Sequence, residues 1–247
     1  MGMIRCDDGV GLADKTVTMM RYRPVHGRVG GGYRAMNLLF DLDGTLTDPF
    51  VGITESIRFA MTRLGRPAPP PEALAWCIGP PLKQSFVQLL ATADEALADD
   101  ALALYRERFG ATGLYENRVY AGIPRVLEAL GARGHDLFVA TAKPGVFADR
   151  ILDHFGLARY FRAIYGSELD GTRSEKADLI AHILERESIA AAEAVMIGDR
   201  KHDILGARQN GMAGYGVLWG YGSKPELEMA GAHTCVVQPE GLLAVIT

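Results

Sequence analysis

Apolar and polar positions follow one another along the chain in patterns that predict buried strands and amphipathic helices. The run Asn37-Leu38-Leu39-Phe40 is almost wholly apolar, is too short for a helix, and is stopped by Asp41 and Gly44. Runs of this kind are typical of strands buried on both faces of a parallel sheet. We therefore expect a strand at 38–41 with Asp41 at its carboxyl end, where open α/β sheets bind their ligands.

After residue 122, helical and strand patterns alternate to the end of the chain. Expected strands lie at 135–141, 162–166, 194–199, 214–219 and 234–237. Expected helices lie at 123–130, 145–155, 174–187, 203–210 and 224–230. Alternation of this kind predicts an α/β fold, with a doubly wound parallel sheet, a Rossmann-like core and right-handed crossovers.

The segment 51–117 has a different, helical pattern. Its apolar stripe from Ile53 to Leu64 is followed by a proline-rich link, a helix opened by Pro71, and further helices at 82–91 and 94–109. This segment is too long for a loop inside a βαβ unit. We expect an inserted all-helical cap domain at 51–117, carried by a catalytic core formed from 37–50 and 118–247.

The first 36 residues differ from the rest. They hold six basic against three acidic residues, end near Gly30-Gly31-Gly32, and contain no apolar core of a signal peptide. We expect 1–36 to be a poorly ordered extension, with Met36 as an alternative start.

Composition then narrows the class of protein. The 247 residues are 48% hydrophobic and 23% charged, with a net charge of −4, which is ordinary for a soluble globular protein and argues against nucleic-acid or membrane partners. No apolar run approaches the length of a membrane span. Three widely spaced cysteines, Cys6, Cys77 and Cys235, suit a reducing compartment, so we expect a cytoplasmic protein.

Asp41 and Asp43 are the first candidates for chemistry. Two carboxylates this close repel each other unless a cation or a shared proton relieves them, and Mg²⁺ prefers such oxygen ligands. A calcium-binding loop is the main alternative, but the required glycine and glutamate positions are occupied by Leu46 and Gly52. The pair therefore indicates a magnesium-assisted catalytic site.

Three later positions at strand ends or helix starts add to this pattern. Thr141, followed by Ala142, Lys143 and Pro144, offers a hydroxyl and backbone N–H groups for an anion, although a threonine at the end of a strand is more often a helix cap. Lys176 opens a helix, where a cation opposes the helix dipole unless it serves an anion; a solvated lysine is the alternative. Asp199 and Asp203 stand four residues apart after another apolar strand.

Together these residues resemble the motifs of the haloacid-dehalogenase-like hydrolase superfamily. Asp41-Leu42-Asp43-Gly44-Thr45 is similar to its first motif, Thr141 to the second, Lys176 to the third, and Gly198-Asp199-Arg200-x-x-Asp203 to the fourth. The helical insert directly after the first motif resembles the small cap of the phosphoglycolate phosphatase-like subfamily. Tyr165-Gly166-Ser167, Gly211 and Gly220-Tyr221-Gly222 are also similar to that subfamily.

The resemblance implies an aspartyl-phosphate mechanism. Asp41 would attack phosphorus, and Asp43 would protonate the leaving oxygen and then activate water. Thr141, the Ala142 amide and Lys176 would hold the phosphoryl oxygens. Mg²⁺ would bind Asp41, the backbone carbonyl of Asp43 and Asp199, with Asp203 in support. Dehalogenases of the superfamily lack the second aspartate, so Asp43 favours a phosphatase.

The resemblance also limits the choice of substrate, which we expect to be a small phosphorylated metabolite with phosphoglycolate first. A nucleoside monophosphate is the next candidate, while a sugar phosphomutase or an inactive binding protein on the same fold are alternatives. Ala142 replaces an asparagine common in the subfamily, which weakens the choice of phosphoglycolate. Gly79-Pro80-Pro81-Leu82 resembles the substrate-facing cap loop, and Arg58, Lys83 and Lys143 are candidate cations for the substrate. We expect a monomer or a homodimer.

Overall fold

The apolar run after Asn37 forms the centre of a parallel sheet, because Leu38, Leu39 and Phe40 are fully buried between two strands that come from much later in the chain. The computed structural model describes residues 35–247. Its strands are β1 (Asn37–Phe40), β2 (Thr47–Asp48), β3 (Arg118–Val119), β4 (Asp136–Pro144), β5 (Ala163–Ser167), β6 (Ala194–Gly198), β7 (Ala213–Val217) and β8 (Thr234–Val236). Six of them form one parallel sheet in the order β5-β4-β1-β6-β7-β8.

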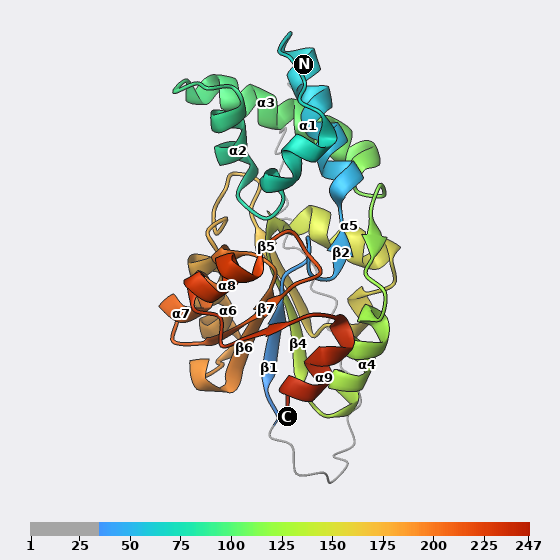
Figure 1. Ribbon diagram of the computed structural model, residues 1–247, viewed down its shortest axis with the longest axis vertical. Helices are drawn as coiled ribbons and strands as arrows, with labels where there is room; N and C mark the ends of the chain where they lie inside the picture. Colours follow the sequence, from blue (N-terminus) through green and yellow to red (C-terminus); the bar gives the residue numbers. More distant parts are fainter. Residues whose placement is uncertain (1–34) are drawn as a thin grey trace, which may run out of the picture.

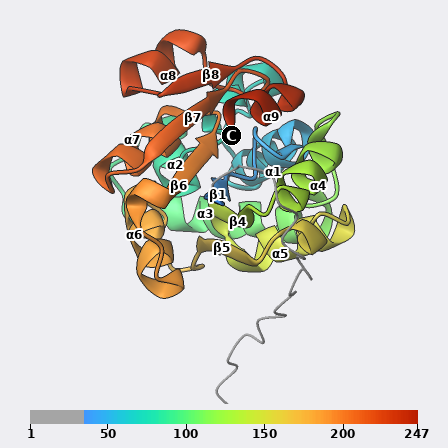
Figure 2. The same ribbon diagram turned by 90° about the horizontal axis from the view of Figure 1, so that it is seen from below.

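Helices cover both faces of this sheet. They are α4 (Ile123–Ala132), α5 (Gly145–His154), α6 (Lys176–Glu187), α7 (Lys201–Gln209), α8 (Lys224–Ala230) and α9 (Leu242–Val245). Figure 2 shows α4, α5 and α9 on one face and α6 and α7 on the other. Alternate residues of β1 serve the two faces, since Leu38 and Phe40 join one hydrophobic cluster and Leu39 joins the other. Burial on both sides explains why the run contains no regular polar position.

The helical cap lies beyond one end of the sheet (Figure 1). It comprises α1 (Phe50–Arg63), the 3₁₀ helix η1 (Pro71–Cys77), α2 (Leu82–Leu89), α3 (Glu95–Arg108) and the π-helix η2 (Phe109–Gly113). The chain enters the cap from β2 and returns through β3, and these two short strands pair antiparallel, Thr47 with Val119 and Asp48 with Arg118. The pair forms a two-stranded hinge between cap and core, and its residues are 70 or more positions apart in sequence.

The predicted order of core elements is confirmed, with small corrections at their ends. Strand β1 stops at Phe40 and β6 at Gly198, so the two acids follow the strands instead of ending them. Strand β4 continues to Pro144 and therefore includes Thr141. The helix expected from Pro71 is a 3₁₀ helix, and the hinge strands were not predicted.

Two expectations concern the ends of the chain and its setting. The prediction for 1–36 falls, up to residue 34, outside the described residues. Within 35–247, no helix combines the length and the apolar character needed to cross a bilayer.

Candidate active site

Asp41 stands at the carboxyl edge of the sheet, immediately after β1. Its backbone N–H donates to the carbonyl of Ile197 at 2.9 Å, which continues the pairing with β6 by one residue. Its Oδ1 accepts from the N–H of Leu42 at 2.8 Å. Gly44 then turns the chain at φ +82°, and its N–H donates to the carbonyl of Thr47. This turn fixes the loop that carries both acids.

Three carboxylates meet at this edge of the sheet. Asp199 follows β6 and Asp203 lies in the first turn of α7, and one carboxylate oxygen from each of Asp41, Asp199 and Asp203 lies within 4.8 Å of the others. All three residues are buried. The structure thus brings together residues that are up to 162 positions apart, as expected from their places after parallel strands.

Lys176 lies against the same group. Its Nζ is 3.0 Å from Asp41 Oδ1 and 2.7 Å from Asp203 Oδ1, and it donates to the carbonyl of Ala140 at 2.9 Å. Only 4% of the side chain is exposed, so the alternative of a solvated lysine is wrong. Although burial opposes it, the charges of Asp203 and Asp41 raise the pKa of Lys176. Lys176 is therefore a fixed cation beside Asp41.

The electrostatics of this group favour a further cation. Three carboxylates and one ammonium leave two negative charges uncompensated in a buried place, which is costly. Burial raises the pKa of Asp203 to about 6, against the opposing effect of Lys176. Burial, followed by the charges of Asp203 and Asp41, raises the pKa of Asp199 well above its usual range. A divalent cation would relieve this repulsion, and the all-oxygen donor set suits Mg²⁺.

Asp199 is held from two directions by contacts that the sequence did not predict. Its Oδ1 accepts from the Thr45 hydroxyl at 3.3 Å and its Oδ2 from the N–H of Tyr221 at 2.8 Å. The Trp219 indole donates to the carbonyl of Thr45, which ties the two loops together. Gly222 lies so close that an added Cβ would be 1.8 Å from the Asp199 carbonyl oxygen. Close packing therefore accounts for a glycine of the Gly220-Tyr221-Gly222 sequence.

Asp43 does not share the three-carboxylate group through its side chain. Its Oδ2 is 2.8 Å from Nζ of Lys143, so this carboxylate is paired with a lysine outside the group of three. Its Oδ1 is buried and has no hydrogen-bond partner among the described residues. Burial raises the pKa of Asp43, although Lys143 opposes the shift. The raised pKa favours the protonated form of Asp43 more than that of a solvent-exposed aspartate.

Thr141 and Ala142 lie within β4, at an irregularity of its pairing with β5. Thr141 pairs with Gly166, but the next pair is Pro144 with Ser167, so Ala142 and Lys143 fall outside the regular ladder. The Ser167 hydroxyl donates to the carbonyl of Ala142 at 2.8 Å. Bulges of this kind are frequent beside active sites because they redirect backbone and side-chain groups. Both predicted residues line the cleft over Asp41.

A cleft of about 620 Å³ separates the cap from the sheet edge. Asp41, Asp43 and Thr141 line its floor, while its roof includes the predicted loop Gly79-Pro80-Pro81 and residues of α2 and α3. Several contacts join cap and core around it, among them three hydrogen bonds. Arg200 donates to the carbonyl of Ile78, Arg106 to that of Leu169, and Gln84 to the Glu175 carboxylate.

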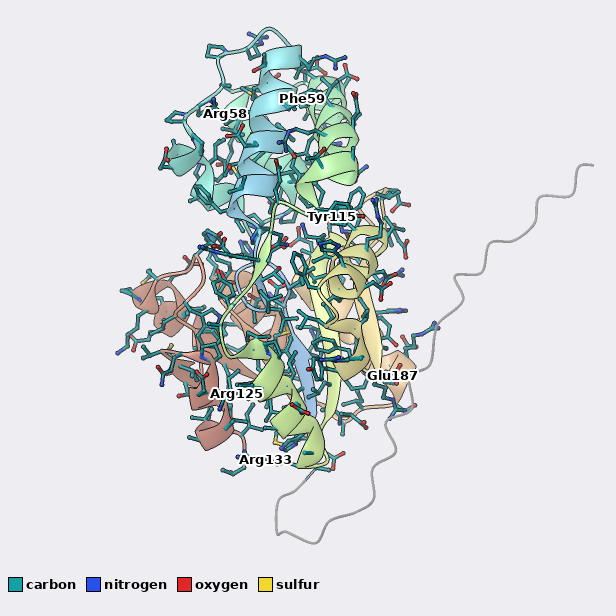
Figure 3. All side chains as sticks on the ribbon, turned by 90° about the vertical axis from the view of Figure 1, so that its right-hand side faces the viewer. Arg58, Phe59, Tyr115, Arg125, Arg133 and Glu187 are labelled. Carbon is teal, nitrogen blue, oxygen red and sulfur yellow. The ribbon has the colours of Figure 1, made fainter. Side chains whose placement is uncertain are left out.

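The candidate cations for the substrate differ in position. Lys83 lines the cleft, but its Nζ is 2.9 Å from Asp99 and 3.3 Å from Glu95. Arg58 is bound within the cap, where it donates to the carbonyl of Pro69 and lies 3.4 Å from Glu55 (Figure 3). Arg58 is not among the residues that line the cleft. Of the three, only Lys143 lies beside the catalytic loop.

Comparison with known proteins identifies the family of this chain. The family model for haloacid dehalogenase-like hydrolases matches residues 38–217. A 5'-nucleotidase of Pseudomonas aeruginosa is 59% identical, over 78% of this chain and 87% of that relative. The tyrosine-protein kinase PtkA of Mycobacterium tuberculosis is 39% identical over 75% of this chain, which matches only 62% of that relative's length.

A phosphoglycolate phosphatase of Vibrio parahaemolyticus is 30% identical, over 74% of this chain and 84% of the relative. Among solved structures, one described as a predicted phosphatase from Clostridium acetobutylicum superposes with a TM-score of 0.83 at 43% identity. It covers 86% of this chain and 99% of the other. The fold and much of the sequence are thus similar to those of proteins described as phosphatases.

Proposed function

Because the chain belongs to the haloacid dehalogenase-like hydrolase family and is a phosphoric monoester hydrolase, we propose that it works through an aspartyl-phosphate on Asp41 with Mg²⁺. The observation that carries the proposal is the meeting of Asp41, Lys176, Asp199 and Asp203 at one edge of the sheet. No other arrangement among residues 35–247 gathers three buried carboxylates in this way.

In the first step, a carboxylate oxygen of Asp41 attacks phosphorus. The contacts with Lys176 and Leu42 fall on Oδ1, so we assign the attack to Oδ2. The bond from Asp41 to phosphorus forms as the bond to the leaving oxygen breaks, and Asp43 gives its proton to that oxygen. Dividing the displacement into two steps is covalent catalysis.

In the second step, water attacks the phosphorus of the aspartyl-phosphate. Asp43, now a carboxylate, takes a proton from this water as the bond to Asp41 breaks. Inorganic phosphate leaves, Asp41 is again a carboxylate, and Asp43 again carries a proton. Each residue thereby returns to its starting state.

The groups around Asp41 hold the phosphoryl oxygens, over which the charge of the transition state is spread. We assign this role to the Thr141 hydroxyl, the Ala142 N–H and Lys176. Asp41, Asp199, Asp203 and the carbonyl of Asp43 would hold Mg²⁺. When bound, the ion supplies positive charge to the phosphoryl oxygens and keeps the carboxylates ionised.

For the substrate, a nucleoside 5'-monophosphate is favoured over phosphoglycolate. The relative with 59% identity is a 5'-nucleotidase, and a cleft of about 620 Å³ suits a nucleoside better than a two-carbon acid. Phosphoglycolate would bring a second anionic group, but Lys83, Arg106 and Lys143 in the lining already have partners.

Phosphoglycolate remains the second candidate, because relatives with 30% identity are phosphoglycolate phosphatases. We also propose a cytoplasmic setting, which the free thiols of Cys77 and Cys235 support.

The test compares wild-type protein with the Asp41→Asn variant on nucleoside 5'-monophosphates and on phosphoglycolate, with Mg²⁺ or with chelator. We expect phosphate release without any acceptor, a higher kcat/KM for the nucleotides, and no activity with chelator. Asp41→Asn should lose more than about 10³-fold in rate at unchanged secondary structure, because the nucleophile is gone. Activity of Asp41→Asn within about tenfold of wild type would contradict the assignment of Asp41 as the nucleophile. Phosphate release only with an acceptor sugar would indicate a phosphomutase.

A further inference from the structure

Lys143 connects the proposed acid of the core to an aromatic ring of the cap. Its side chain is 5% exposed, and Nζ lies 2.8 Å from Asp43 Oδ2. On its other side, Nζ is 4.3 Å from the centroid of the Phe109 ring, which belongs to η2 in the cap. The ammonium group is therefore enclosed between a carboxylate of the core and a ring of the cap.

Both contacts stabilise this buried charge. An ammonium over an aromatic face is attracted to the negative face of the ring, most strongly where water is excluded. Phe109 itself is fixed, because its ring stacks on Tyr105 at 5.1 Å and meets the edge of Phe147 in α5 at 5.6 Å. Phe147 belongs to the core, so this ring cluster spans the boundary between cap and core exactly where Lys143 lies.

The geometry treats the two oxygens of Asp43 differently. Oδ2 is held by Lys143, whereas Oδ1 is buried, has no hydrogen-bond partner among the described residues, and belongs to a residue that lines the cleft. An N–H donor can bind Oδ2 in both protonation states of the carboxyl group, more strongly when it is ionised and still as an acceptor when Oδ1 carries the proton. Lys143 can thus hold one orientation through both proposed steps.

We propose that Lys143 is a positioning residue that directs Oδ1 of Asp43 toward the leaving oxygen, and that Phe109 holds Lys143 in place when the cap is closed. The inference rests on the proposed function, since it concerns the acid of that reaction. Under this inference Lys143 does not bind the substrate phosphate, because its ammonium already lies between Asp43 and the Phe109 ring.

The consequence is a dependence on the leaving group. A nucleoside leaves as a strongly basic alkoxide unless it is protonated, so its release needs a well-placed acid. A p-nitrophenyl group leaves as a stable anion and needs little protonation. Because kcat/KM reports only the steps up to release of the first product, the ratio of kcat/KM for the two substrates isolates the action of Asp43 as an acid.

The first test uses Lys143→Met, which keeps the length of the side chain and removes its charge, and Lys143→Arg, which restores a donor. Lys143→Met should lower kcat/KM about 100-fold for a nucleoside 5'-monophosphate and less than about fivefold for p-nitrophenyl phosphate. Lys143→Arg should recover part of the loss. An equal loss on both substrates, or no loss on either, overturns the inference.

The second test addresses the cap. Phe109→Leu removes the ring from Lys143 but keeps an apolar side chain, and it should lower the same ratio of kcat/KM about tenfold. Phe86→Leu is the matched control, because Phe86 is a fully buried cap ring in contact with Tyr105, whereas the ring under the Lys143 ammonium is that of Phe109. An equal change of the ratio in both variants contradicts the role of Phe109.

Two measurements keep this inference separate from the proposed function. Absence of phosphatase activity in the wild-type protein, or full activity of Asp41→Asn, counts against the function itself. If those results are as proposed and only the ratio is unmoved, the function stands and the role of Lys143 is wrong. Thermal unfolding of each variant shows whether it folds; should Lys143→Met fail to fold, Lys143→Arg and Phe109→Leu decide.

Discussion

At the scale of single residues, Gly44 shows how little freedom the catalytic loop has. Its φ of +82° is strained for any side chain, and an added Cβ would lie 2.2 Å from Asp199 Oδ2. A methyl group there must displace the Asp199 carboxylate, which belongs to the proposed metal site. Even a change of Gly44 to alanine would thus disturb the proposed site directly.

Gly44→Ala should therefore lower kcat/KM by more than about 100-fold, because a displacement of about 1 Å at a reacting group has that effect. Gly134→Ala is the matched control, since Gly134 has a similar φ of +89° and nothing within 4 Å of an added Cβ. The control should lose about 1–2 kcal/mol of unfolding free energy and keep its kcat/KM. Steady-state kinetics with denaturant unfolding measures both. Equal kinetic losses in the two variants would show that backbone strain alone is responsible.

The sequence was informative about these residues only in part. Asp41, Asp199 and Asp203 could be predicted because each follows a run of apolar residues, and parallel strands bring their carboxyl ends to one edge. The pairing of Lys143 with Asp43 could not be predicted, because it depends on a bulge in β4 and on a cap ring. A buried lysine looks like a solvated one in sequence.

At the scale of elements, the hinge between cap and core is held by several hydrogen bonds to one carboxylate. Asp48 in β2 accepts from Arg118 of β3 at 2.6 and 2.9 Å, from the N–H of Phe50 at 3.1 Å, and from the hydroxyl of Tyr221. The backbone N–H of Tyr221 meanwhile binds Asp199. Tyr221 therefore contacts both the Asp199 carboxylate and the hinge.

Tyr221→Phe separates these two contacts, because it removes the hydroxyl and keeps the backbone N–H. Loss of a hydrogen bond to a charged group costs about 1.5–3 kcal/mol. In this variant the cost would destabilise the arrangement in which the cap is closed over the core. We expect kcat/KM for a nucleotide to fall about tenfold and proteolysis at the hinge to accelerate, with unchanged affinity for Mg²⁺. Tyr120→Phe is the control, since Tyr120 adjoins β3 and is tied there by its backbone N–H to Leu46. Weaker Mg²⁺ binding in Tyr221→Phe would contradict this separation.

Elements with a clear period were predicted well, and those made by tertiary contact were not. The strands and helices from α4 to β8 follow apolar patterns that depend on neighbouring residues alone. The strands β2 and β3 contain two residues each, pair across 70 positions, and have no pattern of their own. The π-helix η2 continues α3, so sequence alone gives no sign of its change in pitch.

At the scale of the whole molecule, the buried charges link the proposed metal to folding. Repulsion among Asp41, Asp199 and Asp203 is relieved only in part by Lys176. A cation that binds the folded state and not the unfolded state stabilises the protein by an amount that grows with its concentration.

We therefore expect Mg²⁺ at about 100 times its Kd to raise the free energy of unfolding by about 2.7 kcal/mol, seen as a higher melting temperature. Asp199→Asn should abolish this shift. Without Mg²⁺ the variant should melt no lower than wild type, because it removes one of three repelling charges. Asp136→Asn, an exposed acid paired with Arg162, is the control and should keep the shift. An undiminished shift in Asp199→Asn would place the ion elsewhere.

The overall arrangement, a doubly wound sheet with a helical insert, could be predicted because the insert lacks strand patterns and follows the first acidic motif directly. The preferred substrate could not. Lys83 reads in sequence as a free cation for a carboxylate, whereas in the fold Glu95 and Asp99 neutralise it. Charge balance inside the cleft depends on which cap helices face each other.

The pairing of Thr47 with Val119 has a consequence for the history and the engineering of such proteins. The chain enters the cap through β2 and leaves it through β3, and these strands lie side by side. The cap between them is therefore a module whose two attachment points are neighbours. A few linking residues would span the same gap, and a foreign module could be transplanted there without moving a strand. The cap and the core with its proposed catalytic residues could thereby be exchanged separately.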